Sequence, residues 1–184
     1  MGTITFDRRT INEALQNKYV LPTYQREYKW TEKQFRELLT DLQDAFLQNY
    51  KLEHGRKDVG SYSEYFLGTI ITTELQDGQK SIIDGQQRLA TITLILAYLQ
   101  RKKITETVPQ ITDIDNLIRR ELYGEKDYNL SFEEPRAQLF NLLLDDSINE
   151  DELIEKIDSI ENLDNSSEVL FALFNKIETG VSRV

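Results

Sequence analysis

The chain has 184 residues, with 22 lysines and arginines against 32 aspartates and glutamates, giving a formal net charge of −10. Cysteine is absent and there is one histidine, which excludes disulfides, cysteine-based metal sites and histidine-rich catalytic centres. No apolar run approaches the roughly 18 residues that a membrane helix requires, and the N-terminus lacks the apolar stretch of a signal peptide. We therefore expect a soluble cytoplasmic protein without a membrane partner.

The acidic charge is concentrated in the C-terminal part of the sequence. Residues 1–103 contain 15 Lys and Arg and 13 Asp and Glu, whereas residues 104–184 contain 7 and 19. Because an acidic surface repels a polyanion, contacts with nucleotides or nucleic acid are expected in the first hundred residues. The charge pattern also predicts a division into a core over 1–103 and an acidic helical extension over 104–184 that packs on it.

The first sixty residues predict two helices and one extended segment. Residues Thr10–Glu13 match a capping box and open a short helix. Residues 19–21 precede a proline and are typical of an extended segment. A second capping box at Thr31–Gln34 opens an amphipathic helix that continues to about Tyr50, and the polar residues 51–64 predict a loop.

The rest of the sequence predicts a β-hairpin followed by helices. Residues 65–75 and 80–84 have the composition of strands, and the Asp-Gly pair between them is a strong hairpin signal. A helix follows directly and ends near Lys103. Further helices are predicted near 112–123, 135–145, 149–161 and 166–179. The predicted fold class is α+β, with a small α/β core that contains the hairpin and an all-helical C-terminal part.

Residues 21–30, LPTYQREYKW, are unusually rich in aromatic and hydrogen-bonding side chains. Tyr28 and Trp30 are typical of packing against the helix that follows. Packing alone explains Gln25 and Arg26 less well. An extended segment beside a pocket can present Arg26 to an anion and Gln25 to a ribose or base.

Residues 82–91, IIDGQQRLAT, take a buried strand through a glycine directly into a helix. Such a turn offers free backbone N–H groups at a helix N-terminus, and a glycine lets an anion approach them. Arg88, one turn into the helix, can add charge-assisted bonds to the same anion. Asp84 can hold Mg²⁺ or instead cap the helix. Asp84 and Gly85 alone would fit an ordinary strand-to-helix turn. The longer pattern, with Arg88 and the preceding hairpin, is a more specific signal for an anion site.

Three segments carry a resemblance to a known family. The patterns LPxYQRxYxW at 21–30, YFLGxII at 65–71 and IIDGQQRLxT at 82–91 resemble, in order and spacing, the GmrSD-type restriction endonuclease N-terminal domain family. The likeness covers about residues 4–100 well and 130–136 more loosely. That family is similar to the ParB and sulfiredoxin fold, in which a Gly-x-x-Arg turn binds nucleotide phosphates. The corresponding turn here is Gly85–Arg88.

The resemblance implies a nucleotide-dependent component of an antiphage system that restricts modified DNA. It implies a nucleoside triphosphate and Mg²⁺ as cofactors, with hydrolysis at the turn, while the motifs leave the base open. The implied catalytic residues are Asp84 and Arg88, and Asp84 is also the implied metal ligand. The implied nucleotide-binding residues are Tyr24, Gln25, Arg26, Gly85, Gln86, Gln87 and Thr91. Modified DNA would be reached through a full-length or partner nuclease.

Two departures from the family pattern bear on this expectation. Position 90 is alanine where the family usually has threonine, a small change on one helix turn. Complete restriction proteins of this type carry or recruit an HNH nuclease domain, which needs histidines, and none follows His54. We therefore expect a truncated N-terminal domain or a short stand-alone member, without HNH chemistry in these residues.

Two other classes of function stay open at the level of sequence. A DNA-sensing module without catalysis would use the basic residues 101–103 on the phosphate backbone and Tyr24 to stack a base, although the acidic net charge opposes tight DNA binding. A protein-interaction module would instead present the acidic helices of 104–184 to a basic partner.

Overall fold

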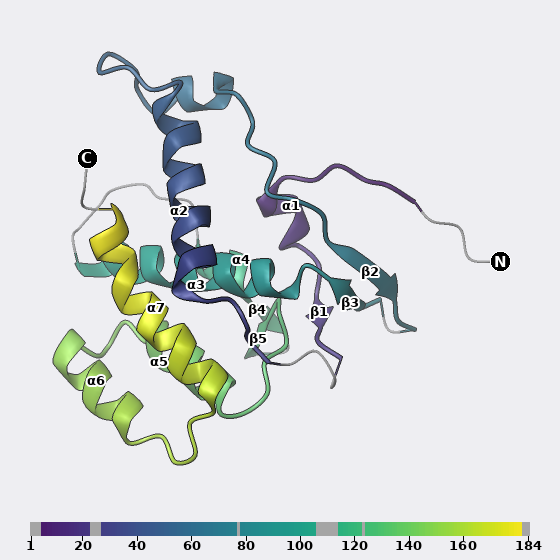
Figure 1. Ribbon diagram of the computed structural model, residues 1–184. Helices are drawn as coiled ribbons and strands as arrows, with labels where there is room; N and C mark the ends of the chain where they lie inside the picture. Colours follow the sequence, from purple (N-terminus) through teal and green to yellow (C-terminus); the bar gives the residue numbers. More distant parts are fainter. Residues whose placement is uncertain (1–4, 23–26, 77, 106–113, 123, 182–184) are drawn as a thin grey trace.

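The computed structural model describes residues 5–22, 27–76, 78–105, 114–122 and 124–181. Its elements, in sequence order, are α1 (Ile11–Ala14), β1 (Tyr19–Val20), α2 (Glu32–Leu47), the 3₁₀ helix η2 (Asp58–Ser61), β2 (Ile71–Glu74), β3 (Lys80–Asp84), α3 (Gln86–Thr105), α4 (Asp115–Ile118), β4 (Arg119–Leu122), β5 (Glu125–Tyr128), α5 (Arg136–Leu143), α6 (Glu150–Asp158) and α7 (Asn165–Val181). Helices packed beside small sheets confirm the predicted α+β class (Figure 1).

Three helices begin where the sequence predicts because each opens with a capping box. In α1, the Thr10 hydroxyl accepts from the Glu13 N–H at 3.2 Å, and the Glu13 carboxylate accepts from the Thr10 N–H at 2.8 Å. The same reciprocal pattern opens α2 at Thr31 and α6 at Asn149. Each box satisfies two backbone donors that a helix N-terminus would otherwise leave unpaired.

The predicted hairpin forms part of a three-stranded sheet with the order β1-β3-β2. Strand β3 pairs antiparallel with β2 and parallel with β1. Strand β2 is shorter than the predicted strand over 65–75, and its register with β3 shifts between Ile71 and Thr72. A bridge between Tyr19 and Leu130 lies on the other side of β1, so the segment that follows β5 joins this sheet.

Helix α3 crosses the middle of the molecule, with α7 packed across it (Figure 1). It contacts α4 and α5 as well as α7. Its buried residues Leu89, Ile92, Leu94 and Ala97 do not lie on a single face of the helix. A helix that is covered on several sides does not show a simple amphipathic pattern.

The predicted all-helical C-terminal part is wrong, because residues 119–122 and 125–128 form the antiparallel strands β4 and β5. Of the predicted helix near 112–123, the described residues 114–122 contain the single turn of α4, followed by β4. Asn129 ends that turn: its backbone N–H donates to the Ile118 carbonyl at 2.8 Å, and its side-chain amide donates to the Leu117 carbonyl at 2.9 Å. Gly124, with φ +85°, lies in the turn between the two strands.

The buried apolar residues form one continuous cluster that runs from Leu15, just before β1, to Ile177 in α7. Its largest fully buried side chains include Phe35 of α2, Leu94 of α3 and Phe140 of α5. Residues from both predicted parts of the sequence therefore share a core. Within the described ranges, no helix combines the length and the apolar character that a membrane crossing requires.

Candidate functional site

Residues 82–91 form a strand, a glycine turn and a helix in direct succession. Strand β3 ends at Asp84, Gly85 has φ +93°, and α3 begins at Gln86. A Cβ atom on Gly85 would lie 3.0 Å from the Thr69 carbonyl oxygen and 3.2 Å from Ile70 Cα. Both the left-handed backbone and this close approach require glycine. The turn therefore packs directly on the segment just before β2.

The Asp84 carboxylate is exposed beside the N-terminus of α3. Asp84 pairs with Ile71 at the register shift of the β2–β3 ladder, and such irregularities redirect side chains at the ends of strands. Among the described residues, none forms a hydrogen bond or an ion pair with this carboxylate. Asp84 is thus accessible to a ligand at the turn.

The Arg88 guanidinium lies against the segment that contains Gly68. Its Nη1 donates to the Thr69 carbonyl oxygen at 3.0 Å. Gly68 has φ +105°, and a Cβ atom there would come within 2.7 Å of Arg88 Cζ. The second and third motif segments are therefore in contact, and Gly68 makes the space for the arginine. A guanidinium carries five N–H donors, so this one bond leaves Arg88 with further hydrogen-bonding capacity.

Gln87 connects the same helix turn to the first motif segment. Its side-chain oxygen accepts from the backbone N–H of Lys29 at 2.7 Å and of Trp30 at 3.4 Å. Its side-chain nitrogen donates to the Glu27 carbonyl oxygen at 2.8 Å. Both ends of the side-chain amide are therefore hydrogen-bonded to the backbone of residues 27–30. The backbone N–H of Gln87 belongs to the first turn of α3.

Thr91 lies one turn further along α3 and is fully buried. Its hydroxyl donates to the Gln87 carbonyl and accepts from the Tyr28 hydroxyl, each at 2.8 Å. Burial raises the pKa of Tyr28 to about 12, against a smaller opposing effect of the Thr91 bond. The Tyr28 N–H donates to the Ser166 hydroxyl at 2.8 Å, so Tyr28 joins α3 to α7. The Thr91 hydroxyl thus faces the interior.

The remaining predicted site residues are placed as follows. Gln86 is the first residue of α3, and its partly buried side chain has a buried oxygen with no hydrogen-bond partner. Tyr24, Gln25 and Arg26 lie outside the described residues. The structure therefore brings Asp84, Gly85, Gln86, Gln87 and Arg88 together on one turn.

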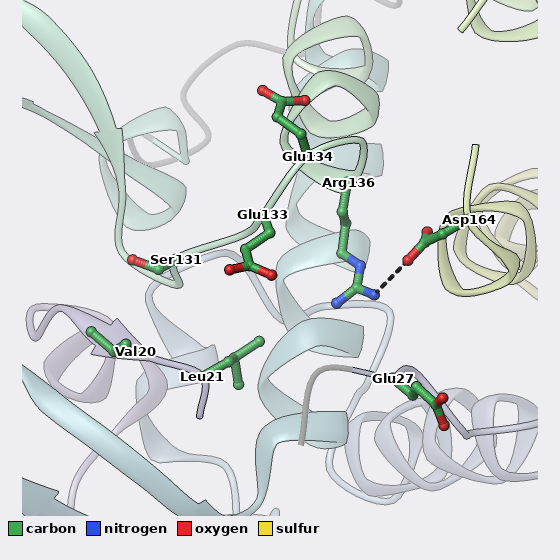
Figure 2. A pocket seen from close by; sticks show the side chains of 8 residues that line it. All are labelled: Val20, Leu21, Glu27, Ser131, Glu133, Glu134, Arg136 and Asp164. Atoms are coloured by element: carbon green, nitrogen blue, oxygen red, sulfur yellow. Dashed lines mark hydrogen bonds and ion pairs between the residues drawn. The ribbon is translucent and has the colours of Figure 1, made fainter. Parts of the chain in front are cut away.

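A small cavity lies on the other flank of the first motif segment. Its volume is about 270 Å³, and Figure 2 shows its lining residues: Val20, Leu21, Glu27, Ser131, Glu133, Glu134, Arg136 and Asp164. Arg136 is only 7 % exposed and forms an ion pair with Asp164 at 3.4 Å. Burial lowers the pKa of Arg136, while Asp164 raises it.

The sequence contained only a weak signal for this cavity, the loose family likeness over 130–136. Its lining comes from four separate stretches of sequence, which no local pattern connects. None of residues 84–88 lines it, so it is a separate feature from the turn.

The turn provides one carboxylate for a metal ion. Within the described ranges, no group of three or more histidine, aspartate or glutamate side chains is arranged to hold a metal. This composition fits Mg²⁺ bound together with a nucleotide, because Mg²⁺ in phosphate-transfer sites commonly uses one or two carboxylates and takes its other ligands from phosphates and water. Asp84 is the described residue that fits this role.

These features define a class: a small α+β domain whose central helix begins at an exposed acid–glycine turn, with an arginine in the first turn of the helix. A family model described as GmrSD restriction endonuclease, N-terminal domain, matches residues 6–181. The chain belongs to this family, which confirms the resemblance found in its motifs and extends it to the C-terminal helices. The membership indicates a component of a restriction system. A search of curated proteins gave no match.

Proposed function

We propose that this protein is the nucleotide-binding and nucleotide-hydrolysing regulatory domain of a modification-dependent restriction system in antiphage defence. The observation that carries this proposal is the turn at the N-terminus of α3. There an exposed carboxylate, a glycine in the left-handed conformation and an arginine lie within five consecutive residues, 84–88.

The proposed phosphate site uses the backbone of the first turn of α3. The first N–H groups of a helix have no acceptor within the helix, and the helix dipole favours an anion at this end. Gln86, Gln87 and Arg88 supply these donors. The Arg88 guanidinium, which is held beside Thr69, adds charge-assisted bonds to phosphate oxygens.

Asp84 completes the proposed site by orienting either Mg²⁺ or the attacking water. When bound, Mg²⁺ would neutralise charge on the phosphate oxygens. Phosphoryl transfer requires mainly positioning and charge stabilisation from the protein, so a site without cysteine or histidine is chemically sufficient. Tyr24, Gln25 and Arg26 are proposed to contact the ribose or base, and modified DNA is proposed to be reached through a nuclease partner or further domain.

The first experiment measures phosphate release from ATP, GTP, CTP and UTP in the presence and absence of Mg²⁺. Replacing Arg88 by alanine is expected to reduce turnover by about 10²-fold, because a donor that stabilises transition-state charge is removed. Arg36→Ala is the matched control, since Arg36 is an exposed arginine on α2 that pairs with Glu32. The control should retain the turnover of the original protein.

Two results would count against the proposal. Turnover by Arg88→Ala equal to that of the control would remove the turn as the site of hydrolysis. If phosphate is released from none of the four nucleotides, equilibrium dialysis with each one shows whether the protein binds a nucleotide without hydrolysing it. Absence of binding to all four would reject the nucleotide site.

A further inference from the structure

Gln87 joins the Asp84–Arg88 turn to the segment that contains residues 27–30. Its backbone belongs to the first turn of α3, and its side chain makes three hydrogen bonds to the backbone of Glu27, Lys29 and Trp30. These bonds use both the acceptor and the donor end of one amide. These bonds join the N-terminus of α3 to residues 27–30, which lie about sixty residues earlier in the sequence.

Residues 27–32, which we call the linking segment, also border an open groove on their far side. The groove has a volume of about 680 Å³ and lies between the linking segment and one face of α7. Tyr28 anchors the linking segment between α3 and α7, through the Thr91 hydroxyl on one side and the Ser166 hydroxyl on the other. Trp30 and Lys29 follow this anchor and line the groove.

We propose that Gln87 is a positioning residue that couples nucleotide occupancy of the Asp84–Arg88 turn to the linking segment and its groove. The inference rests on the proposed function and adds a route by which the bound nucleotide changes a surface away from it. When the Gln87 N–H donates to a phosphate, the first turn of α3 shifts toward the ligand. The Gln87 amide moves with it, and the backbone of Lys29 and Trp30 follows.

The protein has its own reporter for this motion. Trp30 is the only tryptophan, it is partly buried, and its backbone N–H donates to the Gln87 side chain. Its fluorescence therefore reports on the linking segment without interference from other tryptophans. Dialysis measures nucleotide binding independently of this signal.

The experiment titrates the 184-residue chain with ATP, GTP, CTP and UTP in Mg²⁺ and records Trp30 emission alongside equilibrium dialysis. In the original protein, the emission is expected to change with the same concentration dependence as binding. In Gln87→Ala, most of the emission change at saturation is expected to be lost. Gln87→Glu should retain part of it, because the carboxylate accepts from Lys29 and Trp30 but cannot donate to Glu27. The matched control is Gln138→Ala on the exposed face of α5, which should retain the full change.

The outcomes separate this inference from the proposed function. Binding by dialysis without any change in Trp30 emission overturns the coupling and leaves the nucleotide site standing. A full emission change in both Gln87 variants overturns the coupling in the same way. Absence of binding to all four nucleotides removes the proposed function, and the coupling with it.

Discussion

Tyr28 shows how a single residue connects the first motif to the interior. It is 5 % exposed, and its hydroxyl donates to the Thr91 hydroxyl, which in turn donates to the Gln87 carbonyl. Burial favours the neutral form of this phenol and raises the pKa of Tyr28 to about 12. Tyr28 is therefore part of the framework that holds the linking segment, and its protonation state affects stability at high pH.

Replacing Tyr28 by phenylalanine is expected to change the pH dependence of the free energy of unfolding. The pKa of Tyr28 is higher in the folded protein than its ordinary value of 10, so its stabilising contribution is complete below pH 10 and is lost as the pH rises toward about 12. A pKa rise of this size corresponds to a loss of about 2–3 kcal/mol in the free energy of unfolding over this pH range. The variant lacks one hydrogen bond and should be about 1 kcal/mol less stable at pH 8.

Urea unfolding from pH 8 to pH 12 measures this difference. The difference in the free energy of unfolding between the original protein and the Tyr28→Phe variant should narrow or reverse above pH 10, because only the original protein loses the Tyr28 contribution. The other tyrosines titrate in both proteins and cancel in the comparison. A gap that stays constant over this range would contradict the expected pKa.

At the scale of elements, the junction between β3 and α3 depends on close contact with the segment before β2. Gly85 lies against Thr69 and Ile70, and Gly68 lies against the Arg88 guanidinium. The two glycines allow the hairpin and the helix to approach each other at the proposed phosphate site. The YFLGxII and IIDGQQR segments are thus two sides of one packing contact.

Gly85→Ala is expected to lower the free energy of unfolding by about 1–3 kcal/mol, because alanine is strained at φ +93° and its Cβ would press on the Thr69 carbonyl. Phosphate release should fall as well, since the same backbone forms the proposed site. Gly60→Ala is the control, because a Cβ there meets no atom within 4 Å and its φ is not positive. Its effect should stay within about 0.5 kcal/mol. Equal stability of the two variants, measured by urea unfolding, would show that the contact at Gly85 is not tight.

For the whole molecule, one buried cluster unites the near-neutral and the acidic parts of the sequence. Helix α7 contacts α2 and α3 from the first part and α5 from the second. Leu170 of α7 is fully buried within this cluster. A shared core of this kind favours unfolding as a single cooperative unit rather than as a domain over 1–103 and an extension over 104–184.

Leu170→Ala tests this cooperativity. The substitution removes buried methyl groups and is expected to cost about 2–5 kcal/mol. Trp30 fluorescence reports on the first part of the sequence and far-UV circular dichroism on all helices. The two urea transitions should coincide in the original protein and shift together in the variant. Separate midpoints would instead support two independently folding parts.

Local sequence determined the capped starts of three helices, the β2–β3 hairpin, the strand–glycine–helix turn and the family. Each of these depends on residues a few positions apart, such as Thr10 with Glu13 or Asn149 with Glu152. The family follows from three motifs in order, and the match over 6–181 confirms it. Binding of a nucleotide at the turn stays a prediction.

Only the tertiary structure decided how these pieces are joined. Asn129 ends α4 and allows the β4–β5 hairpin where local pattern predicts a helix. Gln87 and Thr91, which sequence analysis assigns to the nucleotide, direct their side chains to residues 27–30. These contacts join residues roughly ten to sixty positions apart, so their energy depends on packing that no local pattern contains. Sequence thus identified the turn, and the tertiary contacts determined which of its side chains are exposed, such as Asp84, and which are bonded within the protein, such as Gln87 and Thr91.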